Sequence, residues 1–129
     1  MSKPAVLLLD DDDDLLDAVS DLVRLISGAE CLRLRSFDEL KAQREAALGC
    51  DRAIIDINLG PSQPSGLDAY HWLEQQQYGG TIAFLTGHAR SHPLVARAAA
   101  LEGVTVHQKP IDVEELREML GVPNVPARV

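Results

Sequence analysis

The chain has 129 residues, the length of one domain, and its apolar content of 46% is sufficient for one hydrophobic core. Its net charge of −8 excludes binding to nucleic acid by neutralisation of phosphates, and no apolar stretch approaches the roughly 20 residues that cross a bilayer. The start lacks the apolar segment of a secretion signal, and two cysteines without a short spacing are typical of reduced thiols. We therefore expect a cytoplasmic protein whose domain contacts neither nucleic acid nor a membrane.

A buried strand is the first predicted element, over 5–9, because a short Leu/Val run between polar residues is typical of a strand covered on both faces. Five consecutive aspartates follow it directly, at 10–14. Apolar residues at helical spacing then predict a helix over about 15–26, and Gly28 is a suitable stop. The aspartates therefore lie in the turn between a buried strand and the next helix.

The segment 31–35 alternates leucine with arginine, which predicts a strand with one face in water, at an edge of the sheet. Ser36 and Glu39 form the pattern of a capping box. We therefore expect a helix to begin there and to end near Gly49.

The third strand, over 53–57, is apolar apart from Asp56. A lone carboxylate in an apolar strand is costly unless it has a partner or a purpose, so we interpret Asp56 as a functional residue. A loop rich in glycine and proline, 60–65, leads into a helix over about 66–77, which a Gly-Gly pair ends.

The last two strands are predicted over 81–85, where Thr86 ends the run, and over 104–108. The alanine-rich helix between them begins near Pro93, which suits a first helical turn, and stops at Gly103. Strand and helix thus continue to alternate through this part of the chain.

Asp112 and Glu115 cap the final helix, which ends at Gly121. We expect residues 1–121 to form one domain and residues 122–129 to form a tail or a linker stub. Alternating strands and helices imply right-handed crossovers and a parallel sheet. The predicted fold class is α/β, with a five-stranded parallel sheet in the order 2-1-3-4-5, doubly wound into three layers as in flavodoxin-like folds.

Polar residues follow the strands at one edge of this predicted sheet. Asp10 and Asp11 end the first strand, Asp56 belongs to the third, Thr86 ends the fourth, and Lys109 follows the fifth. The carboxyl ends of parallel strands share one edge, where open α/β sheets bind ligands. Carboxylates packed there repel by roughly 4 kcal/mol per close pair at an effective dielectric of about 20. A metal ion is the usual remedy, and oxygen ligands select Mg²⁺, Ca²⁺ or Mn²⁺.

In these motifs the chain resembles the receiver domains of two-component response regulators, over essentially residues 5–120. The paired aspartates after the first strand, Asp56 within an apolar strand, Thr86, and Lys109 followed by proline match that family in type and order. The resemblance implies a phosphoacceptor signalling switch that catalyses only its own phosphorylation and dephosphorylation. It also implies a histidine kinase or histidine phosphotransfer protein as the donor, and a downstream protein or an attached effector as the target.

The resemblance further implies a role for each acidic residue. Asp56 would accept the phosphoryl group. Asp11 and Asp56 would bind Mg²⁺ directly, together with the main-chain carbonyl of Asn58, whereas Asp10 would hold the ion through water.

By the same resemblance, Lys109 would pair with one phosphoryl oxygen, and Thr86 would donate a hydrogen bond to another and carry the change toward the next helix. Asn58 and His88 would help to set how fast the phosphoryl group is hydrolysed. The chain departs from the family at Val106, where receivers usually have Tyr or Phe, and in a longer loop after the phosphoacceptor.

Other interpretations remain open. Carboxylates favour helix N-termini, and we interpret Asp12, Asp13 and Asp14 as such helix-start charges. A calcium loop is not expected, because its spaced ligands and central glycine are missing. The longer loop and Val106 leave open a receiver-shaped interaction module that is never phosphorylated. A phosphatase with an aspartyl-phosphate intermediate would need a second acid where Asn58 stands.

Overall fold

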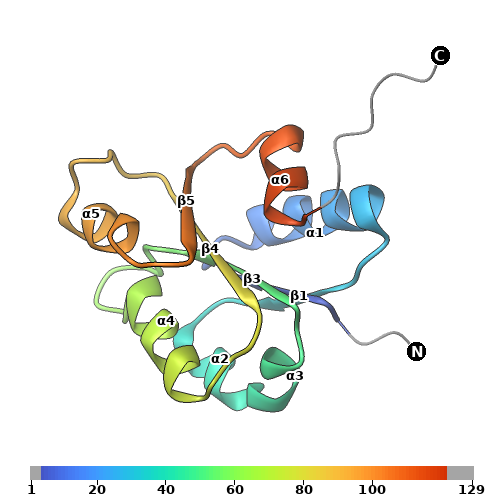
Figure 1. The fold of residues 1–129 in the computed structure, drawn as a ribbon, viewed down its shortest axis with the longest axis horizontal. Coiled ribbons are helices and arrows are strands. Elements are labelled where there is room, and N and C mark those ends of the chain that lie inside the picture. Colours follow the sequence, from blue (N-terminus) through green and yellow to red (C-terminus); the bar gives the residue numbers. More distant parts are fainter. Residues whose placement is uncertain (1–3, 122–129) are drawn as a thin grey trace.

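The computed structural model describes residues 4–121, which form three layers around a central parallel sheet (Figure 1). The strands are β1 (Val6–Leu9), β2 (Cys31–Leu34), β3 (Arg52–Asp56), β4 (Thr81–Thr86) and β5 (Val104–Gln108). Their order is β2-β1-β3-β4-β5 and every pairing is parallel, so the predicted topology is confirmed, with β2 at an edge. The predicted tail, 122–129, lies outside the described residues.

Helices cover both faces of the sheet. The helices are α1 (Asp13–Ser27), α2 (Phe37–Ala42), α3 (Arg44–Leu48), α4 (Gly66–Gln75), α5 (Pro93–Ala99) and α6 (Val113–Met119). Strand side chains alternate between the faces: Leu7 and Leu9 pack with α2 to α5, whereas Val6 and Leu8 pack with α1 and α6. This burial on both faces explains why β1 is apolar throughout. None of the helices within residues 4–121 is both long and apolar enough to traverse a bilayer.

The helix predicted after the second strand is in fact two short helices. Ser36 caps α2 as expected, since its Oγ accepts a hydrogen bond from the Glu39 N–H at 3.1 Å. The Glu39 side chain accepts from the N–H of Arg35, one residue before the position that a capping box requires. At Gln43 the backbone leaves the helical region, with φ −103° and ψ 33°, and α3 then runs on as far as the residue before Gly49.

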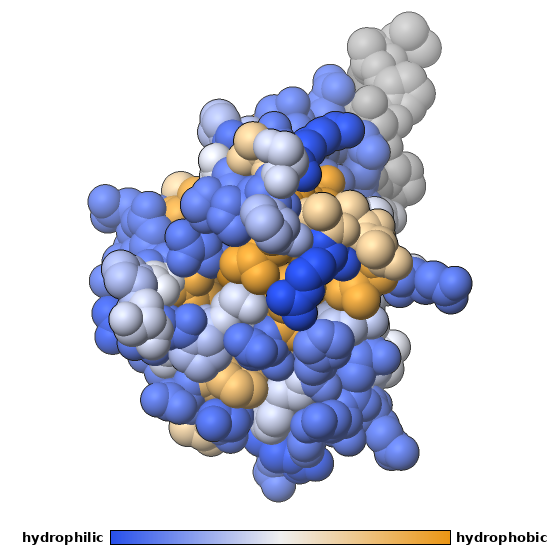
Figure 2. Space-filling model, turned by 90° about the vertical axis from the view of Figure 1, so that its left-hand side faces the viewer, coloured by the Kyte–Doolittle hydropathy of each residue, from blue (hydrophilic) through white to orange (hydrophobic). Residues whose placement is uncertain are grey.

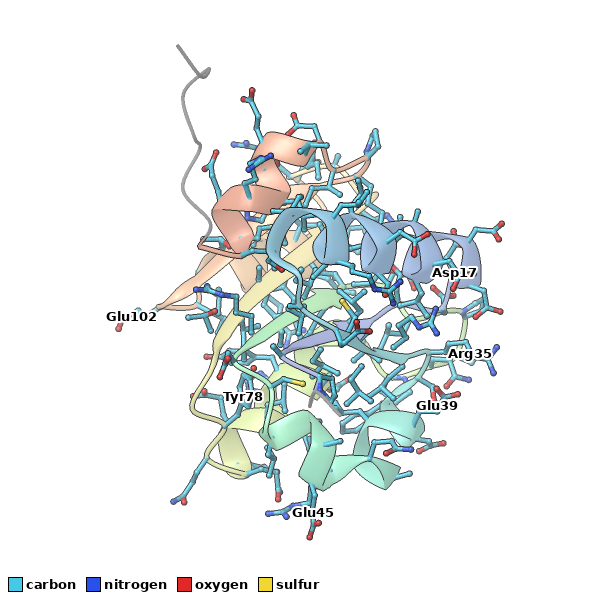
Figure 3. The ribbon with its side chains drawn as sticks, turned by 90° about the vertical axis from the view of Figure 1, so that its right-hand side faces the viewer. Asp17, Arg35, Glu39, Glu45, Tyr78 and Glu102 are labelled. Atoms are coloured by element: carbon cyan, nitrogen blue, oxygen red, sulfur yellow. The ribbon has the colours of Figure 1, made fainter. Side chains whose placement is uncertain are left out.

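The face predicted to meet water carries Arg33 of β2 and Arg35, which follows the end of β2, and both pair with neighbouring helices. Arg33 contacts Asp17 of α1 at 2.8 Å, and Arg35 contacts Asp13 at 3.1 Å and Glu39 at 3.6 Å. Figure 3 shows Arg35 between α1 and α2 at this edge of the molecule. These exposed pairs each contribute about 0 to 1 kcal/mol, so they cover the sheet edge more than they stabilise the fold.

The cysteines are free thiols, as the composition suggests. Cys50 is buried and Cys31 is half-buried. Burial raises the pKa of each thiol to about 11, so both remain protonated at neutral pH.

Candidate functional site

Three carboxylates meet at the carboxyl edge of the sheet because of the strand register. Leu9 of β1 pairs with Ile55 of β3, so the residues that follow, Asp10 and Asp56, come side by side. Both are buried, and Asp11 next to them is exposed. One carboxylate oxygen from each of the three lies within 4.8 Å of the others. The structure therefore brings together the acids that the sequence placed at this edge.

Lys109 reaches into the acidic cluster from the end of β5. Its Nζ lies 2.9 Å from Asp10 Oδ2 and donates a hydrogen bond to Asp56 Oδ2 at 3.0 Å. Its backbone N–H donates to the carbonyl of Thr86 at 2.8 Å, which fixes the chain where it leaves the sheet. The ammonium thus bridges the two buried carboxylates and offsets part of their repulsion.

Burial and like charge alter the titration of this site. Burial, followed by the nearby charge of Asp10, raises the pKa of Asp56 to about 6, although Lys109 opposes the rise. Burial also raises the pKa of Asp10, against the Asp12 N–H and Lys109. Burial lowers the pKa of Lys109, but its pairing with the two carboxylates outweighs burial, and the net shift is upward. At pH 7 Asp56 is therefore mainly a carboxylate and Lys109 an ammonium.

The acidic cluster is suited to a divalent cation. Asp10 Oδ2 is buried and forms no assigned hydrogen bond, although the Lys109 ammonium lies 2.9 Å away as an ion pair. Gly60 lies beside Asp11, since a Cβ there would be 3.4 Å from Asp11 Oδ2, and its φ of +116° is one that a side chain rarely allows. Hard carboxylate oxygens are the ligands that Mg²⁺ prefers, so these residues fit that ion.

The turn after β3 holds Asn58 and the start of α4 against Asp56. The N–H of Asn58 donates to Asp56 Oδ1 at 3.2 Å, and Asn58 Oδ1 accepts from the N–H of Gly60 at 3.0 Å. The chain returns at Gly66, whose N–H donates to the carbonyl of Ile57 at 2.8 Å. A Cβ on Gly66 would collide with the backbone carbonyl of Asp56, which explains the glycine at that position after a long loop.

Thr86 and His88 lie beside this turn. Asp56 pairs with Leu85 in the sheet, so Thr86 is one residue further along β4 at the same edge. Thr86 is fully buried, and its Oγ accepts a hydrogen bond from the N–H of His88 at 2.9 Å. The His88 Nε2 lies 3.2 Å from Asn58 Nδ2. The two positions that the family resemblance linked are therefore in direct contact.

The end of β5 shows what replaces the usual aromatic residue. Val106 packs toward α5, whereas the His107 ring lies on the opposite face with its Nδ1 3.1 Å from Glu115 of α6. His107 therefore does not substitute for an aromatic side chain at position 106. Sequence reasoning did not identify Gln108, which donates to the His88 carbonyl at 2.9 Å, or His92, whose ring stacks on His88. Only the spacing of the two histidines across one loop could have suggested such a contact.

The chain is similar in sequence to known signalling proteins. Residues 6–121 match the response regulator receiver domain. The response regulator protein TodT of Pseudomonas putida is 33% identical over 112 residues, which are 86% of this chain and 47% of that protein. The response regulator protein TmoT of Ectopseudomonas mendocina is 29% identical over 116 residues, which are 88% of this chain and 50% of that protein. The chain thus spans about half the length of the curated relatives that it matches.

Solved structures share the fold. A response regulator receiver domain (CheY-like) from Methanospirillum hungatei JF-1 has a TM-score of 0.77 at 22% identity, covering 93% of this chain and 92% of that one. A response regulator receiver domain protein from Clostridium thermocellum has a TM-score of 0.76 at 24% identity, covering 92% and 91%. Because the family match spans nearly all the described residues and the fold agrees, the chain belongs to the response regulator receiver domains of two-component signalling.

Proposed function

We propose that this domain accepts a phosphoryl group on Asp56 from a phosphohistidine donor in a Mg²⁺-dependent reaction, and that the modified domain regulates a partner. The main support is the position of the Asp56 carboxylate, which contacts the Lys109 ammonium at 3.0 Å and lies within the three-aspartate cluster. Receiver domains are signalling modules and not conventional enzymes, and two-component signalling implies a histidine kinase. That kinase or a histidine phosphotransfer protein would be the donor.

In the proposed step, a carboxylate oxygen of Asp56 attacks the phosphorus atom. The bond from phosphorus to the donor imidazole nitrogen breaks, and the nitrogen keeps the electron pair. Such a transfer needs positioning and charge neutralisation more than covalent chemistry from the protein. Lys109 can follow a phosphoryl oxygen while it keeps its contact with Asp10, and the Thr86 hydroxyl would donate a hydrogen bond to another oxygen.

Asp11 and Asp56 would hold Mg²⁺ directly, with the main-chain carbonyl of Asn58, and Asp10 would hold it through water. When bound, the ion would neutralise charge on the phosphoryl oxygens. Asp11 is the exposed member of the cluster, so it is the acid that a hydrated ion meets first. Lys109 keeps the buried pair of carboxylates partly neutralised until then.

The product would change the balance of charge at the sheet edge. A phosphoryl group adds about −1.5 to −2 charges and three strong acceptors. Thr86 is the buried hydroxyl donor at this edge, and β4 leads from it toward α5. The signal would therefore leave through β4, α5 and β5, toward a downstream protein or an attached effector. We further propose that residues 1–121 are the receiver, that 122–129 form a tail or linker, and that the protein acts in the cytoplasm.

Beryllofluoride, a stand-in for the phosphoryl group, tests the proposal through the amide NMR spectrum. With Mg²⁺, amides of the β3–α4 turn and of the end of β4 should shift, and without Mg²⁺ they should not. Asp56→Asn should abolish the change. An unchanged wild-type spectrum, together with no heat of Mg²⁺ binding in isothermal titration, would favour the interaction module that Val106 and the long loop suggest.

A further inference from the structure

A chain of contacts leaves the site at His88 and reaches the start of α5. The rings of His88 and His92 are stacked, with their centroids 4.3 Å apart and their planes 20° from parallel. His92 is the N-cap of α5, and its Nδ1 accepts a hydrogen bond from the N–H of Leu94 at 3.2 Å. The His88 ring therefore lies against the residue that caps the start of α5.

His88 is itself held by three different parts of the site. Its N–H donates to Thr86 Oγ at 2.9 Å, and its carbonyl accepts from Gln108 Nε2 at 2.9 Å. Asn58 Oδ1 already accepts from the N–H of Gly60, so the Asn58 amide nitrogen is the atom that faces His88. His88 Nε2 is then the acceptor of that contact. A movement of the Thr86 or Asn58 side chain therefore alters a direct contact of His88.

The β5 strand offers no ring toward α5, because its one histidine, His107, faces Glu115 of α6. The strand has no Phe, Tyr or Trp, and Val106 lines a hollow of about 480 Å³ between α5 and the edge of the sheet. Figure 2 shows this side of the molecule as largely hydrophilic, with apolar patches separated by polar side chains. The histidine pair, by contrast, contacts both the site and the cap of α5.

We propose that the stacked rings of His88 and His92 couple the state of Asp56 to the N-terminus of α5. This inference rests on the proposed function. When the Thr86 hydroxyl turns toward a phosphoryl oxygen, its hydrogen bond to the His88 N–H either breaks or draws the His88 backbone with it. In both cases the His88 ring changes position against His92, and the cap of α5 changes with it. A two-state element at α5 is then biased by contacts that differ between the two states.

Substitutions can separate the ring contact from the other contacts of this pair. His88→Phe keeps a ring to stack on His92 but removes the acceptor for Asn58, whereas His88→Ala removes both. His92→Ser keeps an oxygen that can cap α5 but removes the ring. His71→Ala is a matched control, because His71 is an exposed histidine of α4.

The readout is the amide NMR spectrum of the full chain with Mg²⁺ and saturating beryllofluoride. Near the site the amides of Ile57 and Leu85 should shift in the wild type and in every variant. At α5, the shifts of Leu94 and Val95 should fall by roughly half or more in His88→Ala and His92→Ser. They should persist in His88→Phe and in the control.

Two results would overturn the coupling: wild-type shifts at α5 in His88→Ala, or shifts in His88→Phe as small as those in His88→Ala. His88→Phe and His92→Ser keep the test decisive if His88→Ala loses the dispersed spectrum of a folded chain. No change at Ile57 and Leu85 in the wild type would instead refute the proposed function, and the coupling with it. The two failures are thus distinguished by where the shifts are lost.

Discussion

Replacing Asp56 with asparagine should stabilise the metal-free protein, although it removes the proposed phosphoacceptor. The pKa of this carboxyl is raised from 3.8 to about 6, mainly by burial. Each tenfold change in an equilibrium is about 1.4 kcal/mol, so keeping Asp56 ionised in the fold costs about 3 kcal/mol. Asparagine has only one acceptor oxygen, whereas two donors now reach Asp56. One hydrogen bond is therefore lost in Asp56→Asn, which lowers the gain in stability by about 1 kcal/mol. The expected net gain is about 2 kcal/mol at pH 8.

The pH dependence of this gain has a definite sign. The folded-state pKa lies above the unfolded one, so the cost of the charge is absent below about pH 3.8. The cost grows as pH rises from 3.8 to about 6 and is constant above that window. The advantage of Asp56→Asn should therefore be largest at pH 8 and nearly absent at pH 4.

Urea unfolding in EDTA, at pH 8 and at pH 4, measures the gain as a change in the free energy of unfolding. Excess Mg²⁺ should then reverse the order at pH 8, because ligand binding stabilises the wild type by about 2.7 kcal/mol at roughly 100 times its Kd. Asp21→Asn, an exposed change on α1, is the control and should alter stability by less than about 0.5 kcal/mol. An Asp56→Asn protein no more stable than wild type at pH 8 in EDTA would refute the argument from burial.

Three other outcomes follow from the same geometry. Lys109→Gln removes the ammonium that now contacts both buried carboxylates, so Mg²⁺ should bind about tenfold more tightly in isothermal titration. An unchanged affinity would contradict competition between Lys109 and Mg²⁺ for these carboxylates. Gly66→Ala should lower the free energy of unfolding by about 1 to 3 kcal/mol in urea because its Cβ meets the backbone of Asp56, whereas Gly79→Ala, with open space around it, should not. Cys50 should resist iodoacetamide at pH 7 in the folded state and react after unfolding, since burial raises its pKa to about 11. Rapid labelling of Cys50 in the native protein would contradict its burial.

The sequence determined the layers and most of the candidate site. Apolar runs and helical spacing are local properties, so the strands could be placed before their partners were known. A parallel sheet has only one carboxyl edge, and this rule alone brings Asp10, Asp56, Thr86 and Lys109 together. The break at Gln43 was missed, because a capping box predicts where a helix begins and not whether it stays continuous.

Only the tertiary structure decided how these groups share their contacts. The Lys109 ammonium bridges Asp10 and Asp56 because three strands end within reach of one side chain. The stacking of His88 on His92 likewise depends on a loop held by residues of other loops and strands. Side-chain positions in loops follow from contacts that are distant in sequence, and periodicity carries no information about them. The same distinction separates the aspartates that the pattern found from the buried charge and raised pKa that give Asp56 its chemistry.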